Sequence, residues 1–409
     1  MKAMGTIPPG FVANAAGRLE IGGADVEALI AKAQGTPLFV YDFAQIRARV
    51  AMLGAALPPQ LGLHYAIKAN PMEALVTEIA ALVDGLDVAS EGEMRVALAA
   101  GASHISFAGP GKRDPELEAA ILAGVTINLE SEGEARRALL IADRLGIRPK
   151  LAVRVNPDFD LKGSGMRMGG GAKPFGVDAD RAVDLVRLVR AAGADWRGLH
   201  IFAGSQALDA AAIAETQRQT IALAGRLAGE IGEAPPLVNL GGGFGIPYFP
   251  GDKPVDIGLV GRELAEALEK RLEILTDTAF AIELGRYLVG EAGVYLTRIV
   301  DRKTSHGEVF LVTDGGLHHQ LAASGNFGTV VRRNYPVAIA SRFAAEPCDV
   351  VTVVGCLCTP LDRLADQVCL PYAEPGDVVA VFMAGAYGFS ASPGNFLGHP
   401  PAREILVTA

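Results

Sequence analysis

The segment Leu61–Pro71 (LGLHYAIKANP) carries a lysine at the end of an apolar run. The run is strand-like, breaks at Asn70-Pro71 and is followed by the amphipathic segment Met72–Val83. This pattern predicts a buried parallel strand that leads into a helix, with Lys68 at the carboxyl end of the strand. A lysine withdrawn from bulk water loses part of its preference for the charged form, which suits its amine to a Schiff base with an aldehyde cofactor. The alternative is a surface lysine whose ammonium group reaches water.

The three glycines Gly241–Gly243 follow another apolar run. Bare backbone N–H groups can bind a phosphate, and the loop after the seventh strand is a usual phosphate position in barrel enzymes. Ser205 and Arg286 follow the neighbouring strands and would converge on the same place. Together with Lys68, this phosphate site predicts pyridoxal 5′-phosphate as the cofactor. For the glycines alone, a turn without a ligand stays an alternative.

The bulk properties are those of a globular protein with a sizeable core. The chain has 409 residues, of which 50% are apolar and 20% charged, and its formal net charge is -9. Nucleic acids bind to clustered Lys and Arg, and the sequence has no such block, so we expect no nucleic-acid partner. The first residues do not form the apolar stretch of a secretory signal, and no apolar run reaches the ~18 residues of a membrane span. We therefore expect a cytoplasmic protein without membrane contact.

The cysteines predict thiol chemistry rather than a metal site. All four lie in the last quarter of the chain, and their spacing is not that of paired zinc ligands. We expect reduced thiols and no bound metal. The cysteines are Cys348, Cys356, Cys358 and Cys369.

Strand-like and helix-like segments alternate along most of the first 286 residues. Alternation implies a parallel sheet, and eight repeats imply a closed (β/α)₈ barrel of the TIM type, in the α/β class. The eight expected strands are Leu61–Ile67, Gly85–Ala89, His104–Ala108, Val125–Leu129, Lys150–Val155, Gly198–Ala203, Leu237–Leu240 and Ala279–Leu284. The intervening helices, rich in good helix formers, include Glu91–Ala100, Pro115–Ala123, Glu132–Leu145, Ala179–Ala192 and Ala210–Ile231.

Unusual polar residues and glycines fall at the carboxyl ends of these strands, where barrel enzymes place their chemistry. They are Lys68, Asp87, Ser90, Arg154, Asn156, Gly204-Ser205, Gly241–Gly243, Glu283 and Gly285-Arg286. The glycine-rich segment between Pro157 and Asp178 exceeds the ~12–15 residues of an ordinary connection. We predict that it is a mobile active-site flap, with a plain flexible loop as the alternative.

Past Arg286, strand-like runs recur without helices between them, which predicts a C-terminal all-β domain. The runs are Gly293–Val300, Val309–Thr313, Val350–Val354, Val378–Met383 and Glu404–Val407. We place the cofactor-binding barrel at residues 38–286, because the first strand-like run begins near Leu38. The β-domain, a barrel or sandwich, would comprise residues 1–37 and 287–409.

Eight motifs in order resemble the fold-type III pyridoxal-phosphate decarboxylases, the ornithine, diaminopimelate and arginine decarboxylase group. The resemblance runs from about Leu38 to the carboxyl terminus and implies an alanine-racemase-like barrel with a β-domain. The motifs are Tyr65–Pro71, Asp87–Glu93, Arg154–Pro157, Gly204–Gln206, Gly241–Gly245, Glu283–Arg286, Gly355–Cys358 and Gly385–Tyr387.

The resemblance implies a role for each motif. Lys68 would carry the cofactor as a Schiff base, and Asp87 and Arg154 would flank the lysine and the ring. Glu283 would hydrogen-bond the pyridine nitrogen and keep it protonated, so that the ring accepts the electrons left when CO₂ departs. The phosphate end would be bound by Ser205, Gly241, Gly242, Gly243, Gly285, Arg286 and Tyr387.

The resemblance also implies that Cys358 returns a proton to the substrate's Cα. In the family the corresponding cysteine reaches the partner subunit's site, which implies a homodimer with shared active sites. A buried structural thiol is the alternative for Cys358 and the expectation for Cys348 and Cys369. The expected substrate contacts are Arg286, Tyr387, Thr359 and His318.

Four positions depart from the family pattern. Phe202 replaces a histidine, so we expect it to stack on the cofactor ring without transferring a proton. Leu284 and Cys356 each replace a proline. Thr359 replaces the acidic residue that binds the substrate's distal amine, which weakens recognition of diaminopimelate, ornithine and arginine.

The segment Asp314–Gln320 also lacks the arrangement of the diaminopimelate enzymes. His318, His319, Arg332 and Arg333 could supply a different polar end to the substrate pocket, and an exposed turn is the alternative for the two histidines. This divergence resembles the decarboxylases found with exosortase and exopolysaccharide systems, or with siderophore pathways.

We therefore expect a decarboxylase that uses pyridoxal 5′-phosphate to release CO₂ from an amino acid and leaves an amine or another amino acid. A racemase of the same architecture is one alternative, but it would have an arginine in the place of Glu283. A non-catalytic homologue is another, and the presence of Lys68, Glu283 and Cys358 argues against it.

Overall fold

The computed structural model describes residues 1–325 and 333–408. The chain divides into two compact units. One, which we call the barrel unit, comprises residues 50–246 and 254–285. The other, the β unit, comprises residues 1–49, 247–253 and 286–409.

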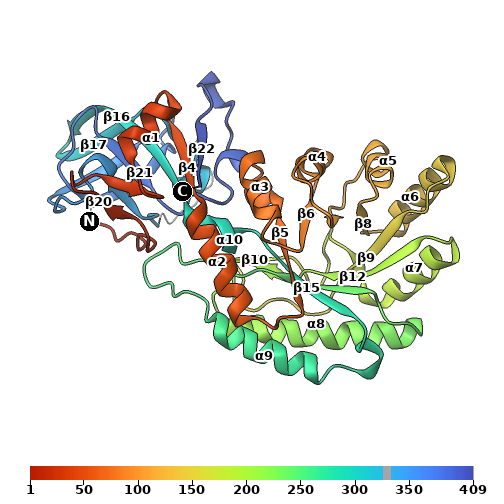
Figure 1. Cartoon of the computed structure of the whole chain (residues 1–409). Coiled ribbons are helices and arrows are strands. Elements are labelled where there is room, and N and C mark those ends of the chain that lie inside the picture. The colour runs from red at the N-terminus through yellow and green to blue at the C-terminus, as the bar shows by residue number, and fades with distance from the viewer. Residues whose placement is uncertain (326–332, 409) are drawn as a thin grey trace. The chain divides into compact units, whose positions relative to one another are not determined.

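The barrel unit is built on a closed ring of parallel strands (Figure 1). The ring runs β9-β12-β14-β15-β5-β6-β7-β8, and a pairing between β8 and β9 closes it. The expected (β/α)₈ barrel is therefore confirmed. Its strands are β5 (Leu61–Ala66), β6 (Gly85–Val88), β7 (Ile105–Phe107), β8 (Thr126–Leu129), β9 (Lys150–Asn156), β12 (Asp195–Ile201), β14 (Leu237–Gly242) and β15 (Ala279–Leu284).

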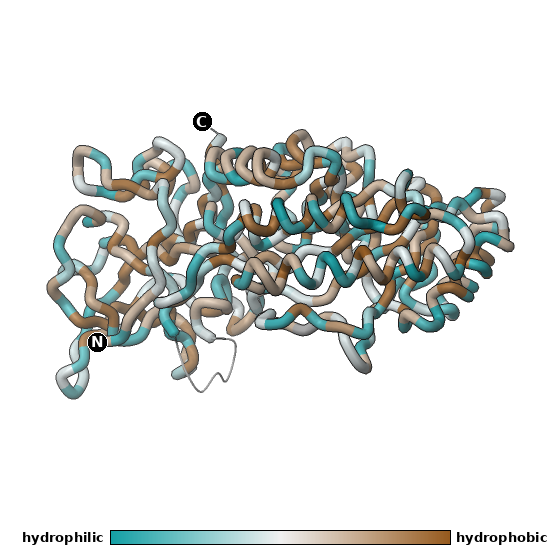
Figure 2. Tube along the Cα trace, turned by 90° about the horizontal axis from the view of Figure 1, so that it is seen from below, coloured by the Kyte–Doolittle hydropathy of each residue, from teal (hydrophilic) through white to brown (hydrophobic). Residues whose placement is uncertain are grey.

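Helices surround this ring and bury one face each. Several begin at a Ser or Asp whose side chain accepts a backbone N–H of the first turn, as Ser90, Ser131 and Asp209 do. Hydrophilic and hydrophobic residues alternate along the helices that face the viewer in Figure 2, as amphipathic helices require. The helices are α3 (Glu73–Ala80), α4 (Glu91–Ala99), α5 (Asp114–Leu122), α6 (Glu132–Leu145), α7 (Ala179–Ala191), α8 (Ala210–Ile231) and α9 (Ile257–Glu269).

The long segment after β9 is tied to the chain that follows β12. Two short strands form in it, β10 (Met166–Arg167) and β11 (Val177–Asp178). Strand β10 pairs with β13 (Gly204–Ser205), and the N–H groups of Met168 and Gly169 donate to the carbonyl of Ala203. The segment thus lies beside Ser205, while its predicted mobility stays a prediction.

The β unit is built on a mixed sheet in the order β18-β21-β16-β17-β19-β20, to which β4 and β22 are added through β16. A small antiparallel sheet of β1, β2 and β3 precedes it. The strands are β1 (Val12–Ala13), β2 (Leu19–Ile21), β3 (Ala24–Asp25), β4 (Leu38–Asp42), β16 (Gly293–Ser305), β17 (Glu308–Thr313), β18 (Val337–Ile339), β19 (Asp349–Val354), β20 (Arg363–Leu370), β21 (Val378–Val381) and β22 (Arg403–Val407). Helices α1 (Val26–Ala33), α10 (Arg286–Val289) and α11 (Leu321–Ser324) join them.

The boundary expected at Leu38 differs from the observed one. Strand β4 pairs with β16 and β22, so it belongs to the sheet of the β unit rather than to the barrel. All five of its residues are buried, and an apolar run of this kind does not reveal which sheet it joins. Helix α2 (Phe43–Ala56) then leads from one unit into the other.

None of the helices in residues 1–325 and 333–408 combines the length and the apolar character that crossing a membrane requires.

Candidate active site

Lys68 lies in a single 3₁₀ turn, η1 (Ile67–Ala69), directly after β5. Its ammonium nitrogen lies 5.4 Å from the centre of the Phe202 ring. The side chain is exposed, while its neighbours Ile67 and Ala69 are buried. The expectation that this amine is withdrawn from water is therefore wrong for the structure, in which the Lys68 side chain is exposed. The protein presents the amine at the open, carboxyl end of the barrel.

Glu283 on β15 is a buried carboxylate at the same end, with 6% exposure. Its neighbours in register are His64 on β5 and Gly242 on β14. The amide of Asn239 donates to Oε2 over 3.2 Å, and Nε2 of His200 lies 3.0 Å from the same oxygen. Burial raises the pKa of the Glu283 carboxyl, but the charges of His200, Lys68 and Arg154 outweigh it and lower that pKa to about 2. Glu283 is thus held ionised.

The glycine turn that ends β14 packs backbone against backbone. A Cβ at Gly242 would lie 1.9 Å from the carbonyl oxygen of Glu283, and one at Gly243 would lie 2.1 Å from that of Gly204. Gly241 and Gly243 have φ values of +70° and +81°, which favour glycine. The turn therefore adjoins both Glu283 and the Gly204-Ser205 strand.

The N–H of Gly241 is donated to Oδ1 of Asn239 over 2.8 Å. Gly241 therefore shapes the turn, and the expectation of backbone contacts to a phosphate rests on Gly242 and Gly243. A Cβ at Gly241 would also lie 3.1 Å from the Phe202 ring, so that ring packs against the turn. Gly285 is equally close to the lysine turn, since a Cβ there would lie 2.8 Å from that of Ala69.

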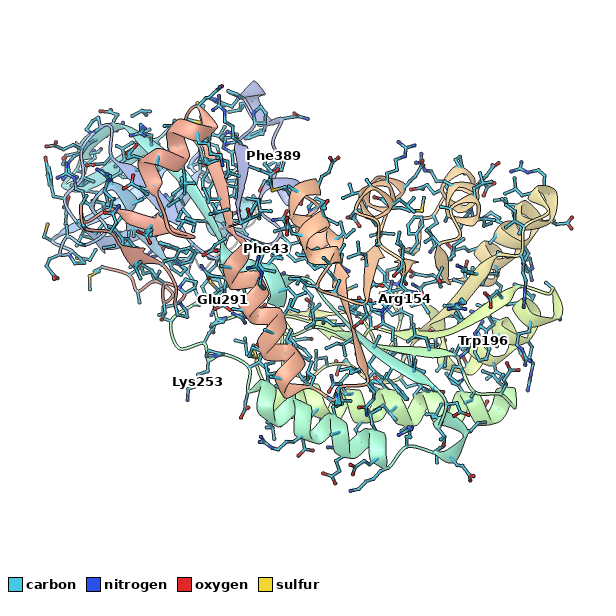
Figure 3. All side chains as sticks on the ribbon, in the orientation of Figure 1. Phe43, Arg154, Trp196, Lys253, Glu291 and Phe389 are labelled. Carbon is cyan, nitrogen blue, oxygen red and sulfur yellow. The ribbon has the colours of Figure 1, made fainter. Side chains whose placement is uncertain are left out.

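Asp87 and Arg154, the two residues expected beside the lysine, both have buried charged partners. Oδ2 of Asp87 lies 3.3 Å from Nδ1 of His64. Burial lowers the pKa of His64, but the charge of Asp87 raises it more, so the net shift is upward. Arg154, labelled in Figure 3 near the carboxyl end of β9, donates to Oε1 of Glu130 over 2.9 Å.

The sequence analysis missed His64, Glu130 and Asn239, and it left His200 without a role. All four are polar residues within or just after apolar strands. Asn239 precedes Gly241 by two positions in β14, so the period-two spacing of a strand could have identified it. The other three carry no comparable spacing signal.

Arg286 and Tyr387 lie together in the β unit. Nη1 of Arg286 donates to the hydroxyl of Tyr248 over 2.6 Å, and its guanidinium carbon lies 4.6 Å from the centre of the Tyr387 ring. The Nε of Arg286 is buried and has no hydrogen-bond partner in the part of the chain that the structure describes. Burial lowers the pKa of Arg286, but the tyrosines Tyr248 and Tyr387 raise it more, so the guanidinium is held charged.

The loops of the β unit hold the expected substrate contacts. Cys358 is exposed and Thr359 is half-buried. Asp362, which the sequence analysis missed, accepts the N–H groups of Leu317 and Leu357 over 2.7 and 2.8 Å. This carboxylate therefore joins the His318 loop to the cysteine loop.

His318 and His319 are buried, with 0% and 3% exposure, so the exposed-turn alternative is wrong. His319 bonds to the Tyr295 hydroxyl and the Pro400 carbonyl, whereas neither ring nitrogen of His318 has a hydrogen-bond partner among residues 1–325 and 333–408. Arg332 lies outside the described residues. The guanidinium carbon of Arg333 lies 3.8 Å from the centre of the Phe249 ring.

The cysteines are free thiols, as expected. Cys348 is exposed, so the expectation of a buried structural thiol is wrong at that position. The residue lies directly before β19, outside the strand. Sγ of Cys356 lies 3.7 Å from Nδ1 of His399. Burial and the charge of Asp362 raise the pKa of the Cys356 thiol to about 11, which leaves it protonated near neutral pH.

Comparison with known proteins identifies the family. Residues 43–290 match the family described as "Pyridoxal-dependent decarboxylase, pyridoxal binding domain". The chain is 37% identical over 393 residues to "L-glutamyl-[BtrI acyl-carrier protein] decarboxylase" of Niallia circulans, which covers 94% of this chain and 91% of that protein. It is 33% identical over 410 residues to the diaminopimelate decarboxylase of Methanothermobacter thermautotrophicus, covering 98% and 92%.

Solved structures agree with these sequence matches. The diaminopimelate decarboxylase of M. jannaschii in complex with L-lysine has a TM-score of 0.87 at 26% identity, covering 97% of this chain and 92% of that one. That of Helicobacter pylori, also with L-lysine, has a TM-score of 0.81 at 26% identity, covering 93% and 94%.

The described residues fit pyridoxal 5′-phosphate. Lys68 presents an amine beside the flat ring of Phe202, and Glu283 presents an ionised carboxylate at the same end of the barrel. The turn at Gly242 and Gly243 is packed so closely that a Cβ at either residue would clash with a backbone oxygen, and the N–H groups of such a glycine turn can bind a phosphate. The chain therefore belongs to the pyridoxal-dependent decarboxylase family, and it is an enzyme that decarboxylates an amino acid with pyridoxal 5′-phosphate as its cofactor.

Proposed function

We propose that the substrate is an α-amino acid whose distal end carries an acyl linkage instead of a free amine, such as a glutamyl group attached through its side-chain carboxyl to a carrier. Decarboxylation requires a free α-amine and a free α-carboxylate, so a carrier must be attached at the far end. The main support is Thr359, a half-buried uncharged side chain at the position where the family resemblance implies an acid. The relative from Niallia circulans, named for a glutamyl carrier-protein substrate, supports this choice.

The neighbouring histidine loop supports the same substrate class. Burial, with the nearby His319 and His399, lowers the pKa of His318 to about 4, so this imidazole is neutral near pH 7. A neutral imidazole can donate one hydrogen bond and accept another. Such a group suits an amide or thioester carbonyl better than it suits the ammonium group of diaminopimelate or ornithine.

In the proposed site Lys68 binds the cofactor covalently, and Glu283 holds a proton at the pyridine nitrogen. Ser205, Gly242, Gly243, Arg286 and Tyr387 bind the phosphate, with Gly241 and Gly285 shaping the turns around it. The bound cofactor supplies an electron sink for the bond to the departing carboxylate. Phe202 supports one face of the ring by stacking.

We further propose that Cys358 donates a proton to the substrate's Cα, and that it does so in the active site of a second copy of the chain. The support is its exposure: a thiol that serves only packing would be buried, and Cys358 is not. A homodimer with shared sites follows from this proposal. The cytoplasmic location and the exosortase-associated branch stay predictions.

The test is CO₂ release from a panel of substrates. We would compare free glutamate, diaminopimelate, ornithine and arginine with glutamate joined through its γ-carboxyl to pantetheine. We expect kcat/KM to be at least about 10-fold higher for the pantetheine conjugate, because an ammonium group has no acidic partner at Thr359. Preference for diaminopimelate would contradict the proposed substrate while leaving the decarboxylase chemistry intact.

The two alternatives to decarboxylation are not favoured. A racemase would place an arginine where this chain has Glu283, and the relatives reported above are decarboxylases. A non-catalytic homologue would have no reason to retain Lys68, Glu283 and Cys358 together. Loss of optical activity from the substrate without CO₂ release would revive the racemase.

A further inference from the structure

The barrel interior is not filled in the usual way. Barrel interiors are normally packed with layers of Val, Ile and Leu. Here a cavity of about 450 Å³ is lined by residues of β5, β7, β8, β9, β12, β14 and β15. Many are small or polar and recur at every second position, which is the spacing of inward-facing residues. They include Gly62 and His64, Thr126 and Asn128, Lys150 and Ala152, Leu237 and Asn239, and Ala279 and Ala281.

The cavity extends from an exposed mouth to a buried floor, and we call it the lower well. Its exposed residues lie at or just before the amino-terminal ends of the strands: Gln60, Asp84, Ser103, His104, Gly124, Lys150, Pro236 and Ala279. Its buried polar residues lie deeper along the strands: His64, Asn128, His200 and Asn239. Lys68 and the glycine turn are at the other, carboxyl end of the barrel.

His200 on the floor has a polar atom that the protein leaves unsatisfied. It is 3% exposed, and its Nδ1 has no hydrogen-bond partner among the residues that the structure describes. Its Nε2 lies 3.0 Å from Oε2 of Glu283 and pairs with that carboxylate. Buried polar atoms that line a roomy polar cavity are normally satisfied by ordered water.

We propose that the lower well is a hydrated passage from the amino-terminal face of the barrel, and that His200, which this water reaches, is a positioning residue that holds the carboxylate of Glu283 in place. The inference rests on the proposed role of Glu283 at the pyridine nitrogen. Water in the well hydrogen-bonds to Nδ1 of the imidazole, while Nε2 faces the carboxylate over 3.0 Å.

The charged groups around His200 fit this role. In register it is flanked by Arg154 on β9 and Asn239 on β14, and it faces Glu283 on β15. Arg154 is already bonded to Glu130, and Lys68 is the group that binds the cofactor. Of the three side chains that lower the pKa of Glu283, His200 has the largest effect. His64 on β5 pairs with Asp87 and is also the in-register neighbour of Glu283, whose charge helps to raise the pKa of His64.

The first test replaces the imidazole. His200→Gln removes the imidazole at similar size, and we expect kcat to fall about 10-fold or more with KM little changed, because the position of the Glu283 carboxylate is altered and substrate contacts are not. We also expect the pH dependence of the cofactor's absorbance in the holoenzyme to shift. Unchanged kcat and an unchanged absorbance profile would overturn the inference.

The second test blocks the passage and keeps the histidine. Thr126→Leu and, independently, Ala152→Leu would fill the well, with Thr77→Leu on the exposed face of α3 as the matched control. The readout is ¹⁵N NMR of the histidine rings, with the His200 signals identified by their loss in His200→Gln. We expect solvent exchange of the His200 ring proton to slow at least 10-fold in both filled variants and not in the control. Equal exchange rates in all three would refute the passage.

Two further outcomes keep this inference separate from the proposed function. If Glu283→Gln is fully active, the proposed role of Glu283 fails and this inference fails with it. If Glu283→Gln is inactive while His200→Gln and both filled variants behave as the unaltered enzyme, only the well is refuted. A small organic molecule released from the purified protein, and absent from the Thr126→Leu protein, would identify the well as a ligand site and overturn the hydrated passage.

Discussion

Two buried histidines, one in each unit, are placed in opposite electrostatic environments. His200 in the barrel unit lies 3.0 Å from the carboxylate of Glu283. His318 in the β unit lies against other imidazoles, with its ring centre 3.7 Å from that of His319 and 5.3 Å from that of His399. The first environment places an imidazole against an ionised carboxylate, and the second favours a neutral ring. The barrel unit thus pairs its histidine with a carboxylate, and the β unit keeps its histidine uncharged.

If the barrel unit carries the chemistry, removing its lysine should have the largest effect. We expect Lys68→Ala to lower kcat/KM by roughly 10³-fold or more and to abolish covalent attachment of the cofactor. Borohydride treatment followed by peptide mass spectrometry measures the attachment. Lys270→Ala, a change of an exposed lysine of the same unit, is the control and should behave as the unaltered enzyme. Covalent attachment of the cofactor in the Lys68→Ala protein would contradict the assignment of Lys68 as the residue that binds it.

We expect the β unit to contribute one reacting group, the thiol of Cys358, so the chemistry would not be confined to the barrel unit. We expect Cys358→Ala to lower kcat by about 10²-fold, the usual size for a lost proton donor, with the cofactor still attached. Cys348→Ala, another exposed cysteine of that unit, serves as the control. Stopped-flow measurement should show that the cofactor still reacts with substrate. Full activity of Cys358→Ala would show that the Cys358 thiol is not the proton donor.

Because His318 is held neutral in the folded protein, the free energy of unfolding should depend on pH in the acidic range. Its folded-state pKa of about 4 lies below the ordinary value of about 6.5, so the unfolded chain takes up the proton first. The free energy of unfolding should therefore fall as the pH drops from about 6.5 to about 4, by about 3 kcal/mol. Urea denaturation of His318→Gln should lack this part of the pH dependence. His306→Asn changes an exposed histidine and should retain it.

The smallest expected effect is on substrate choice. We expect Thr359→Asp to raise kcat/KM for diaminopimelate relative to the γ-linked glutamyl substrate by about 10-fold, because it supplies a charge for the distal ammonium group. Thr359→Val, which keeps the shape but adds no charge, is the control. If Thr359→Asp and Thr359→Val have the same ratio of kcat/KM for the two substrates, Thr359 does not contact the distal end of the substrate. His318 would then be the remaining expected contact there.

The sequence by itself determined the barrel architecture and several of the candidate site residues at its strand ends. Apolar runs separated by helix-forming segments placed the eight strands within a few residues, and helices such as α6 and α8 have the bounds expected. Lys68, Glu283 and the glycine turn were identified because a parallel barrel brings its strand ends together. The second sheet was only partly predicted: β20 was missed because polar residues interrupt its apolar pattern.

Only the tertiary structure decided which residues face one another. The run Leu38–Asp42 looked like a barrel strand, and strand pairing assigned it to the other unit. The link between His200 and Glu283, and the lower well beneath them, depend on residues from several strands that are far apart in sequence. Spacing along a chain reveals which side of a strand a residue faces, but the volume left between opposing side chains exists only once the ring has closed.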